Sequence, residues 1–293
     1  DNLNQELAIL DVREQGLFAE NHLLFASNTP LSRLEIEAPR LVPRTSCPIV
    51  LCDGRDNRRK LAAQAAALLA NYGYTDLHVL EGGVEEWHNA GFELFAGINV
   101  PSKAFGEFIE ESCHTPHLTP SDLVDLQNSG IKIVILDSRP AQEFHKMSLP
   151  GAINVPGAEL VYRIREAAPD PDTLVVVNCA GRTRSIIGAQ TLINVGIENK
   201  ILALENGTMG WHLAGFDLEK GQSRPAPKPS KKNLAWAQNV ADQLSGLAGI
   251  NYIDWDTLSL WQSAPEAHTL YVFDVRSPEE YIAGHLPGSR NAP

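Results

Sequence analysis

The chain has 293 residues, of which 43% are hydrophobic and 20% are charged. This balance supports buried cores and excludes disordered and fibrous proteins, and the length suits two domains with part of a third. The formal net charge of −12 argues against a nucleic-acid partner, and no apolar run reaches the roughly 18 residues that a membrane span needs. Residues 1–10 lack the pattern of a signal peptide, so we expect a cytoplasmic protein.

The first predicted element is a strand that ends in Asp-x-Arg, and this pattern occurs three times along the chain. An aliphatic run precedes the Asp each time, which is typical of a buried parallel strand that leads into a charged loop. The three copies span residues 8–13, 133–139 and 270–276. Such repetition predicts a tandem array of similar domains.

In the first two copies a second predicted strand runs directly into a cysteine. Cys52 follows Asp11 by 41 residues, and Cys179 follows Asp137 by 42. This near agreement of spacing supports the equivalence of the two cysteines.

The segment after each cysteine has the same order of elements in both copies. A short polar loop leads to an amphipathic helix that ends before a glycine, and a third strand and a tail containing Trp and Ala-Gly-Phe follow. The helices are predicted over 60–70 and 186–194, and the strand-and-tail segments over 79–92 and 202–216. Strands that alternate with helices predict α/β domains, each a doubly wound parallel sheet flanked by helices.

The repeats divide the chain into four parts. We expect a first domain over 1–98, a second over 99–222 and a Pro- and Lys-rich linker over 223–232. A third domain begins at 233, and because its cysteine loop would lie beyond Pro293, we expect it to be incomplete in residues 233–293.

The loop that begins at Cys179 has the composition of an anion site. It is predicted to lie between the end of a strand and the start of a helix, where open α/β sheets bind ligands. Backbone N–H groups and the positive end of the helix would stabilise a thiolate and an anionic substrate. The two arginines add donors for sulfonate or phosphate oxygens. The loop residues expected to contact a substrate are Gly181, Arg182, Thr183, Arg184 and Ser185.

Together these motifs resemble those of the rhodanese-like sulfurtransferases, and the resemblance covers nearly the whole chain. It is carried by the Asp-x-Arg strands, the Pro-Gly-Ala-Ile-Asn segment at 150–154, the cysteine loop and the Gly-x-x-x-Trp-x-x-Ala-Gly tail. The resemblance implies an enzyme in which Cys179 attacks the outer sulfur of thiosulfate or a related donor. The sulfur is then held as a persulfide and passed to cyanide or a thiol. It further implies that Arg139 faces the same pocket, although Arg139 could instead pair with Glu143.

The first copy departs from this pattern. Cys52, Arg55 and Arg58 form a second candidate site, but Asp53 and Asp56 introduce negative charge that acts against a thiolate and an anionic donor. Two alternatives to sulfur transfer therefore stay open for this copy. One is a phosphatase of the same fold with a Cys-x5-Arg loop, since five residues separate Cys52 from Arg58. The other is a non-catalytic protein-binding or regulatory role.

A metal or cofactor is not expected. The four cysteines include no Cys-x-x-Cys pair, and His114 and His117 beside Cys113 are only a weak metal pattern.

Overall fold

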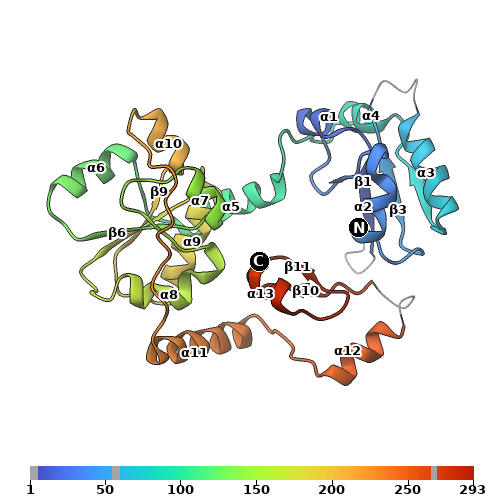
Figure 1. Ribbon diagram of the computed structural model, residues 1–293. Helices are drawn as coiled ribbons and strands as arrows, with labels where there is room; N and C mark the ends of the chain where they lie inside the picture. The colour runs from blue at the N-terminus through green and yellow to red at the C-terminus, as the bar shows by residue number, and fades with distance from the viewer. Residues whose placement is uncertain (1–5, 55–59, 265–268) are drawn as a thin grey trace. The chain divides into compact units, whose positions relative to one another are not determined.

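The computed structural model describes residues 6–54, 60–264 and 269–293, so Arg55 and Arg58 of the second candidate site lie outside the described residues. The chain divides into two compact units (Figure 1). One comprises the residues up to Pro101 together with Tyr252–Pro293, and the other comprises Ser102–Asn251. No helix among the described residues is long and apolar enough to span a membrane.

The second unit is built on a parallel five-stranded sheet. The strand order is β5 (His117–Leu118), β9 (Ile201–Leu204), β8 (Leu174–Asn178), β6 (Ile133–Asp137) and β7 (Ile153–Asn154). The chain first runs outward from β6 to β7 and then continues on the other side of β6 with β8 and β9. The order therefore reverses between β6 and β8, which is where open parallel sheets bind ligands at the carboxyl ends of their strands.

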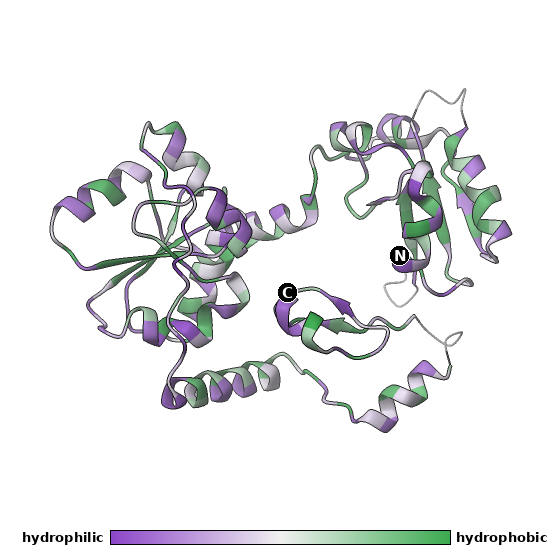
Figure 2. Ribbon diagram, in the orientation of Figure 1, coloured by the Kyte–Doolittle hydropathy of each residue, from purple (hydrophilic) through white to green (hydrophobic). Residues whose placement is uncertain are grey.

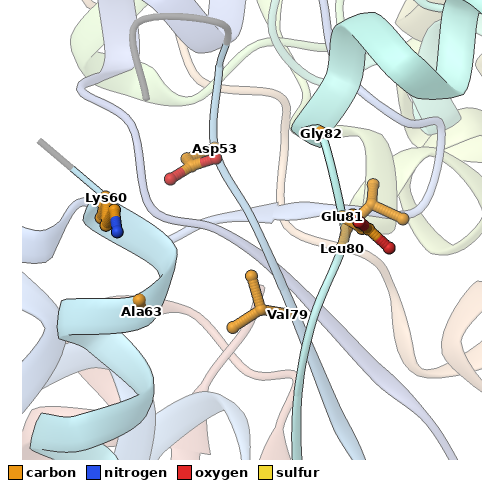
Figure 3. Close-up of a pocket in the computed structure, with 7 residues that line it drawn as sticks. All are labelled: Asp53, Lys60, Ala63, Val79, Leu80, Glu81 and Gly82. Carbon is orange, nitrogen blue, oxygen red and sulfur yellow. The ribbon is translucent and has the colours of Figure 1, made fainter. Parts of the chain in front are cut away.

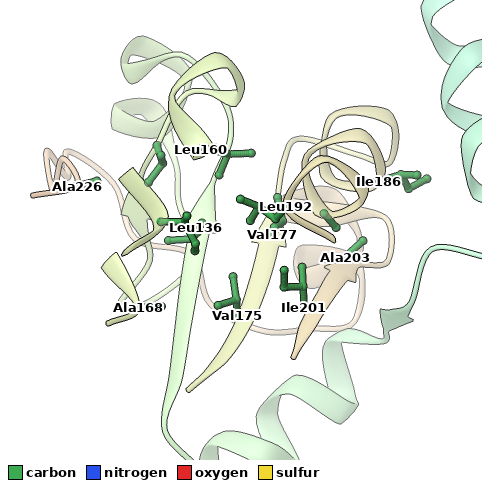
Figure 4. Close-up of a cluster of buried hydrophobic side chains, with 13 residues drawn as sticks. Leu136, Leu160, Ala168, Val175, Val177, Ile186, Leu192, Ile201, Ala203 and Ala226 are labelled. Carbon is green, nitrogen blue, oxygen red and sulfur yellow. The ribbon is translucent and has the colours of Figure 1, made fainter. Parts of the chain in front are cut away.

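Helices cover both faces of this sheet because successive strand residues point to opposite sides. Leu136, Val175 and Val177 face one side and pack with α8 (Leu160–Ala167) and α9 (Thr183–Asn194), as Figure 4 shows. Ile135, Leu174 and Val176 face the other side, against α6 (Pro120–Asn128), α7 (Ala141–Lys146) and α10 (Gly207–Leu213). Figure 2 shows hydrophobic residues concentrated in the strands of this sheet.

Two further helices lie in the second unit, the first of them from Ser102 on. α5 (Val100–Cys113) contributes Ile109 to the core beside α9. α11 (Lys231–Leu247) packs on α8, where the Arg165 guanidinium lies 3.8 Å from the centroid of the Trp236 ring. The segment predicted as a linker runs beside β7, since the Asn154 amide donates to the Arg224 carbonyl at 2.7 Å and Ala226 is buried.

The first unit repeats this plan with a four-stranded parallel sheet. Its strand order is β2 (Ser27–Asn28), β1 (Ala8–Asp11), β3 (Ile49–Cys52) and β4 (Leu77–Val79). The helices around it are α1 (Gln15–Glu20), α2 (Leu34–Leu41), α3 (Leu61–Asn71) and α4 (Gly83–Asn89). The two sheets confirm the predicted α/β fold with parallel strands flanked by helices.

The last residues of the chain add a small substructure to the first unit. It contains α12 (Trp255–Gln262), β10 (Phe273–Asp274), α13 (Pro278–Ala283) and β11 (Arg290–Asn291), and β10 pairs with β11 in parallel. The Tyr271 hydroxyl donates a hydrogen bond to the Leu41 carbonyl at 2.6 Å.

Candidate active site

The Asp-x-Arg turn has the same geometry in all three copies. In the second unit, Nε and Nη2 of Arg139 donate to the two carboxylate oxygens of Asp137 at 2.8 and 2.7 Å. Nη2 of Arg139 also donates to the Met147 carbonyl at 2.7 Å. Arg13 with Asp11 and Arg276 with Asp274 form the same forked pairs.

Arg139 is therefore held inside the protein as a support for the turn after β6. Its side chain is only 4% exposed and that of Asp137 is fully buried. The alternative expectation that Arg139 pairs with Glu143 is wrong, because Glu143 binds Arg184 while Asp137 binds Arg139. The contact of Arg139 with a substrate stays a prediction.

A further contact that recurs in all three copies involves an asparagine after each Asp-x-Arg turn, which the sequence motifs above do not include. Asn154 Nδ2 donates to the Arg139 carbonyl at 2.7 Å, and Asn28 and Asn291 make the same bond to Arg13 and Arg276 at 2.9 and 2.8 Å. The signal was present in the sequence, since each asparagine follows its arginine by 15 residues.

Cys179 lies directly after β8 and before α9, at the reversal of strand order. The residue is 2% exposed, and its Sγ lies 3.6 Å from Ser185 Oγ. Ser185 in turn donates to the Arg182 carbonyl at 2.8 Å, which folds the loop around the sulfur. The structure thus brings the predicted nucleophile and the end of its loop together.

The backbone of Cys179 is held by the start of α10. The amide and the hydroxyl of Thr208 both donate to the Cys179 carbonyl, at 2.8 and 3.0 Å. Asn178 Nδ2 donates to Thr208 Oγ1 at 3.1 Å and to Asp137 Oδ2 at 2.9 Å. A continuous buried network therefore connects the end of β6, the end of β8 and the start of α10.

Gly207 permits this close approach of the two segments. Its φ is +52°, a left-handed conformation that favours glycine. A Cβ at this position would lie 2.4 Å from the Cys179 carbonyl oxygen and 2.6 Å from that of Gly181. A side chain could fit only if the cysteine loop moved.

Both arginines of the loop are paired with carboxylates. Nη1 and Nη2 of Arg184 donate to the two oxygens of Glu143 at 3.0 and 2.9 Å. Arg182 pairs with Glu110 and, at 3.1 Å, with Glu107, both on α5. The pKa of Arg184 is raised, chiefly by its hydrogen bonds to Glu143 and also by electrostatic interaction with Cys179 and Asp137. Arg184 is therefore positioned to interact electrostatically with the cysteine.

The remaining predicted loop residues have different surroundings. A Cβ on Gly181 would meet no atom within 4 Å, so this part of the loop is open. Thr183 begins α9 and packs against Gly106 of α5, while Ser185 is fully buried.

The cysteine of the first unit does not occupy the equivalent position. Asp11 pairs with Cys52 in the register of β1 and β3, whereas Asp137 pairs with Asn178 in that of β6 and β8. Cys52 is thus the last residue of its strand and matches Asn178 rather than Cys179. The equivalence of the two cysteines expected from their spacing is wrong by one residue.

Asp53 stands where the second unit has Cys179. The Asp53 carbonyl accepts a hydrogen bond from the Val84 amide at 3.0 Å, as the Cys179 carbonyl accepts one from the Thr208 amide. A Cβ on Gly83 would lie 2.3 Å from the Asp53 carbonyl oxygen. Oδ2 of Asp53 accepts a hydrogen bond from the Ala62 amide at 3.0 Å, in the first turn of α3. The start of this helix is therefore already bonded to a carboxylate of the protein itself.

The environment of Cys52 disfavours its thiolate. The side chain is fully buried, and its Sγ lies 3.6 Å from the Leu10 carbonyl oxygen. Burial, followed by the negative charges of Asp11 and Asp53, raises the pKa of this thiol far above the ordinary value of 9.0. Cys52 therefore remains protonated at neutral pH.

A cavity of about 360 Å³ opens beside Asp53, at the carboxyl ends of β3 and β4. Asp53 and two residues of the start of α3, Lys60 and Ala63, line one side, and residues 79–82 line the other (Figure 3). Within the described parts of the chain, no group of three or more His, Cys, Asp or Glu side chains is placed to hold a metal ion.

Comparison with known proteins agrees with this architecture. The sequence model of the rhodanese-like domain matches residues 1–90 and 119–214. The chain therefore belongs to the family of rhodanese-like domain proteins, as its motifs predicted.

One solved structure covers almost the full chain. The crystal structure of thiosulfate sulfurtransferase from Pseudomonas aeruginosa is 51% identical and superposes with a TM-score of 0.93, covering 99% of this chain and 54% of that one.

Two curated relatives match shorter parts. The HTH-type transcriptional regulator Rv0324 of Mycobacterium tuberculosis is 30% identical over 104 residues, which are 36% of this chain and 45% of that protein. The uncharacterized protein YqhL of Bacillus subtilis is 35% identical over 79 residues, which are 27% of this chain and 59% of that protein. The chain thus spans about half of the length of each of these proteins.

Proposed function

We propose that the protein is a sulfurtransferase that moves sulfane sulfur through Cys179. The observation that carries the proposal is the position of Cys179 between the carboxyl end of β8 and the start of α9, where its Sγ lies 3.6 Å from Ser185 Oγ in the first turn of α9. The 51% identity with a thiosulfate sulfurtransferase supports the same reaction class.

The proposed reaction has two displacement steps. The thiolate of Cys179 attacks the outer sulfur of thiosulfate, a new S–S bond forms, and the bond to the inner sulfur breaks as sulfite leaves with the electron pair. Cyanide or a thiolate then attacks the terminal sulfur of the Cys179 persulfide. Thiocyanate or a new persulfide leaves, and the Cys179 thiolate is regenerated.

The loop residues would stabilise the negative charge at each step. Arg182 and Arg184 would bind the sulfonate oxygens of the donor, and the open backbone at Gly181 would admit the donor. The thiol of Cys179 now donates to Ser185 Oγ at 3.6 Å; once the sulfur is anionic, the Ser185 hydroxyl would turn from the Arg182 carbonyl and donate to the sulfur. Arg139 would act by holding the turn after β6, and no metal or cofactor is required.

For the first unit we propose a non-catalytic role. Two observations support this assignment: Asp53 stands in the position of the nucleophile, and the pKa of Cys52 is raised by burial. Neither favours the phosphatase alternative, because an attacking thiolate at Cys52 would have to form inside the core. The unit would then serve binding or regulation.

The proposal is tested by intact mass after incubation with thiosulfate, before and after addition of cyanide. The wild type is expected to gain one sulfur, about 32 Da, and to lose it again with cyanide. Cys179→Ser is expected to gain none, while Cys52→Ser serves as the control and should behave like the wild type. A wild type that gains no sulfur, or a Cys179→Ser variant that still gains it, would refute the proposal.

A further inference from the structure

The cysteine loop of the second unit is in direct contact with α5. A Cβ on Gly106 of this helix would lie 2.8 Å from Cγ2 and 3.2 Å from Cα of Thr183, so the helix and the loop touch without space for a side chain. Ile109, on the same helix, packs into the core beside α9. α5 therefore packs directly against one side of the cysteine loop.

Two carboxylates of α5 form ion pairs with Arg182. Glu110 bonds both Nε and Nη2 of the guanidinium, and Glu107 lies 3.1 Å from Nη2. The side chain of Glu110 is 19% exposed and that of Glu107 is 57% exposed. The hydrogen bonds that Arg182 donates to Glu110 are the main cause of its raised pKa, so the two glutamates hold a permanently charged group.

In the ion pairs of the loop arginines, carboxylates outnumber guanidinium groups, and the His117 ring lies 3.7 Å from Glu110 on the outer side. The two guanidinium groups of Arg182 and Arg184 face three carboxylates, those of Glu107, Glu110 and Glu143. A donor whose sulfonate binds Arg182 must displace at least one carboxylate oxygen or share the guanidinium with it. The repulsion between these carboxylates and a donor grows with the donor's own negative charge.

We propose that Glu107 and Glu110 are specificity-determining residues that set the charge of the sulfur donor accepted at Cys179. They compete with the donor for Arg182 and disfavour a dianionic donor more than a monoanionic one of the same chemistry. The inference rests on the proposed sulfur transfer through Cys179 and adds to it a preference for donors of low negative charge.

A pair of donors that differ by one charge tests this directly. Thiosulfate is a dianion, and methanethiosulfonate is a monoanion that carries the same transferable sulfur on a sulfonyl group. KM for both donors is measured from thiocyanate formation with the wild type, Glu107→Gln, Glu110→Gln and the double variant. Glu111→Gln, an exposed position on the same helix, is the matched control.

The double variant is expected to lower KM for thiosulfate roughly two- to fivefold, the effect of removing partly exposed ion pairs, and to change KM for methanethiosulfonate less. Glu107→Gln alone, at a largely exposed side chain that the fold does not need, is expected to show the same trend with a smaller shift. Added salt should reduce the difference between the wild type and the variants.

The outcomes separate the two proposals. An unchanged ratio of the two KM values in the double variant, or an equal change in Glu111→Gln, would overturn the role of Glu107 and Glu110 while leaving sulfur transfer intact. A wild type that takes sulfur from neither donor would overturn the proposed function, and this inference with it.

Discussion

Replacement of Gly207 by alanine tests whether the start of α10 sets the position of the cysteine loop. The alanine Cβ would lie 2.4 Å from the Cys179 carbonyl oxygen, and ordinary van der Waals contact begins near 3.4 Å, so the two segments must separate by 1 Å. A displacement of about 1 Å at a reacting group can slow a reaction roughly 100-fold. The left-handed φ adds a loss of about 1–2 kcal/mol in unfolding free energy.

The assay is the single-turnover rate at which thiosulfate adds sulfur to the protein, followed by intact mass under conditions in which the variant is folded. Two glycine-to-alanine variants provide matched controls. Gly196→Ala has a positive φ but open space around its Cβ, so it carries the backbone strain without the displacement. Gly83→Ala has both the backbone strain and a close contact, but its Cβ would meet the Asp53 carbonyl in the first unit.

We expect the rate of sulfur addition to fall only in Gly207→Ala. All three variants are expected to lose stability, as measured by urea unfolding. A Gly207→Ala variant that is folded and adds sulfur at the wild-type rate would refute the argument that this contact positions Cys179. A loss of rate in Gly83→Ala would contradict a non-catalytic first unit.

Three further predictions concern the buried groups. Because the pKa of Cys52 is raised in the folded state, its contribution to stability is complete below the unfolded value near 9.0 and is lost as pH rises above it. Above pH 9, the unfolding free energy of Cys52→Ala, measured with urea, should therefore fall less steeply with pH than that of the wild type, by up to about 1.4 kcal/mol per pH unit. An equally steep fall in both proteins would contradict a buried, protonated thiol at Cys52. Arg139→Met leaves the buried Asp137 carboxylate without its partner and should cost about 3–5 kcal/mol of unfolding free energy. Arg276→Met removes the same pair where the arginine is half-exposed and should cost much less. Equal losses in the two variants would count against the buried pair. Thr208→Val introduces the residue that the first unit has at Val84 and removes the hydroxyl that joins Asn178 to the Cys179 carbonyl. The variant should lose about 1–3 kcal/mol of unfolding free energy and add sulfur more slowly. Wild-type stability and rate would show that this network is dispensable.

The central strands and the position of Cys179 could be predicted from the sequence because buried parallel strands consist of uninterrupted runs of aliphatic residues. The strand predicted to run into Cys179 is β8, and the cysteine that follows it lies at the carboxyl edge of the sheet. The alternation of strands and helices was sufficient to indicate both the parallel sheets and their helical covering.

The register of the first unit could not be recognised by matching cysteines. Cys52 was the most distinctive residue in its segment, and the difference of one residue in its spacing from Asp11 was small beside the similarity of the motifs. In a strand, however, one residue moves a side chain to the opposite face. In the first unit, this shift of one residue places Asp53 at the position of Cys179 and Cys52 inside the core.

The partners of the loop arginines also could not be predicted. Glu110 precedes Arg182 by 72 residues, and their contact depends on how α5 packs against α9. Residues 105–111 have the acidic, amphipathic pattern of a short helix, but nothing in this pattern indicates that two of its carboxylates bind the cysteine loop.

Mapping of the transferred sulfur tests the central claim most directly. After incubation with thiosulfate, persulfides are alkylated and the protein is digested, and the mass of each cysteine peptide is measured. The account predicts an additional sulfur on the peptide that contains Cys179 and none on those that contain Cys47, Cys52 or Cys113. An additional sulfur on Cys52, or its absence from Cys179, would contradict the assignment of the second unit as the site of sulfur transfer.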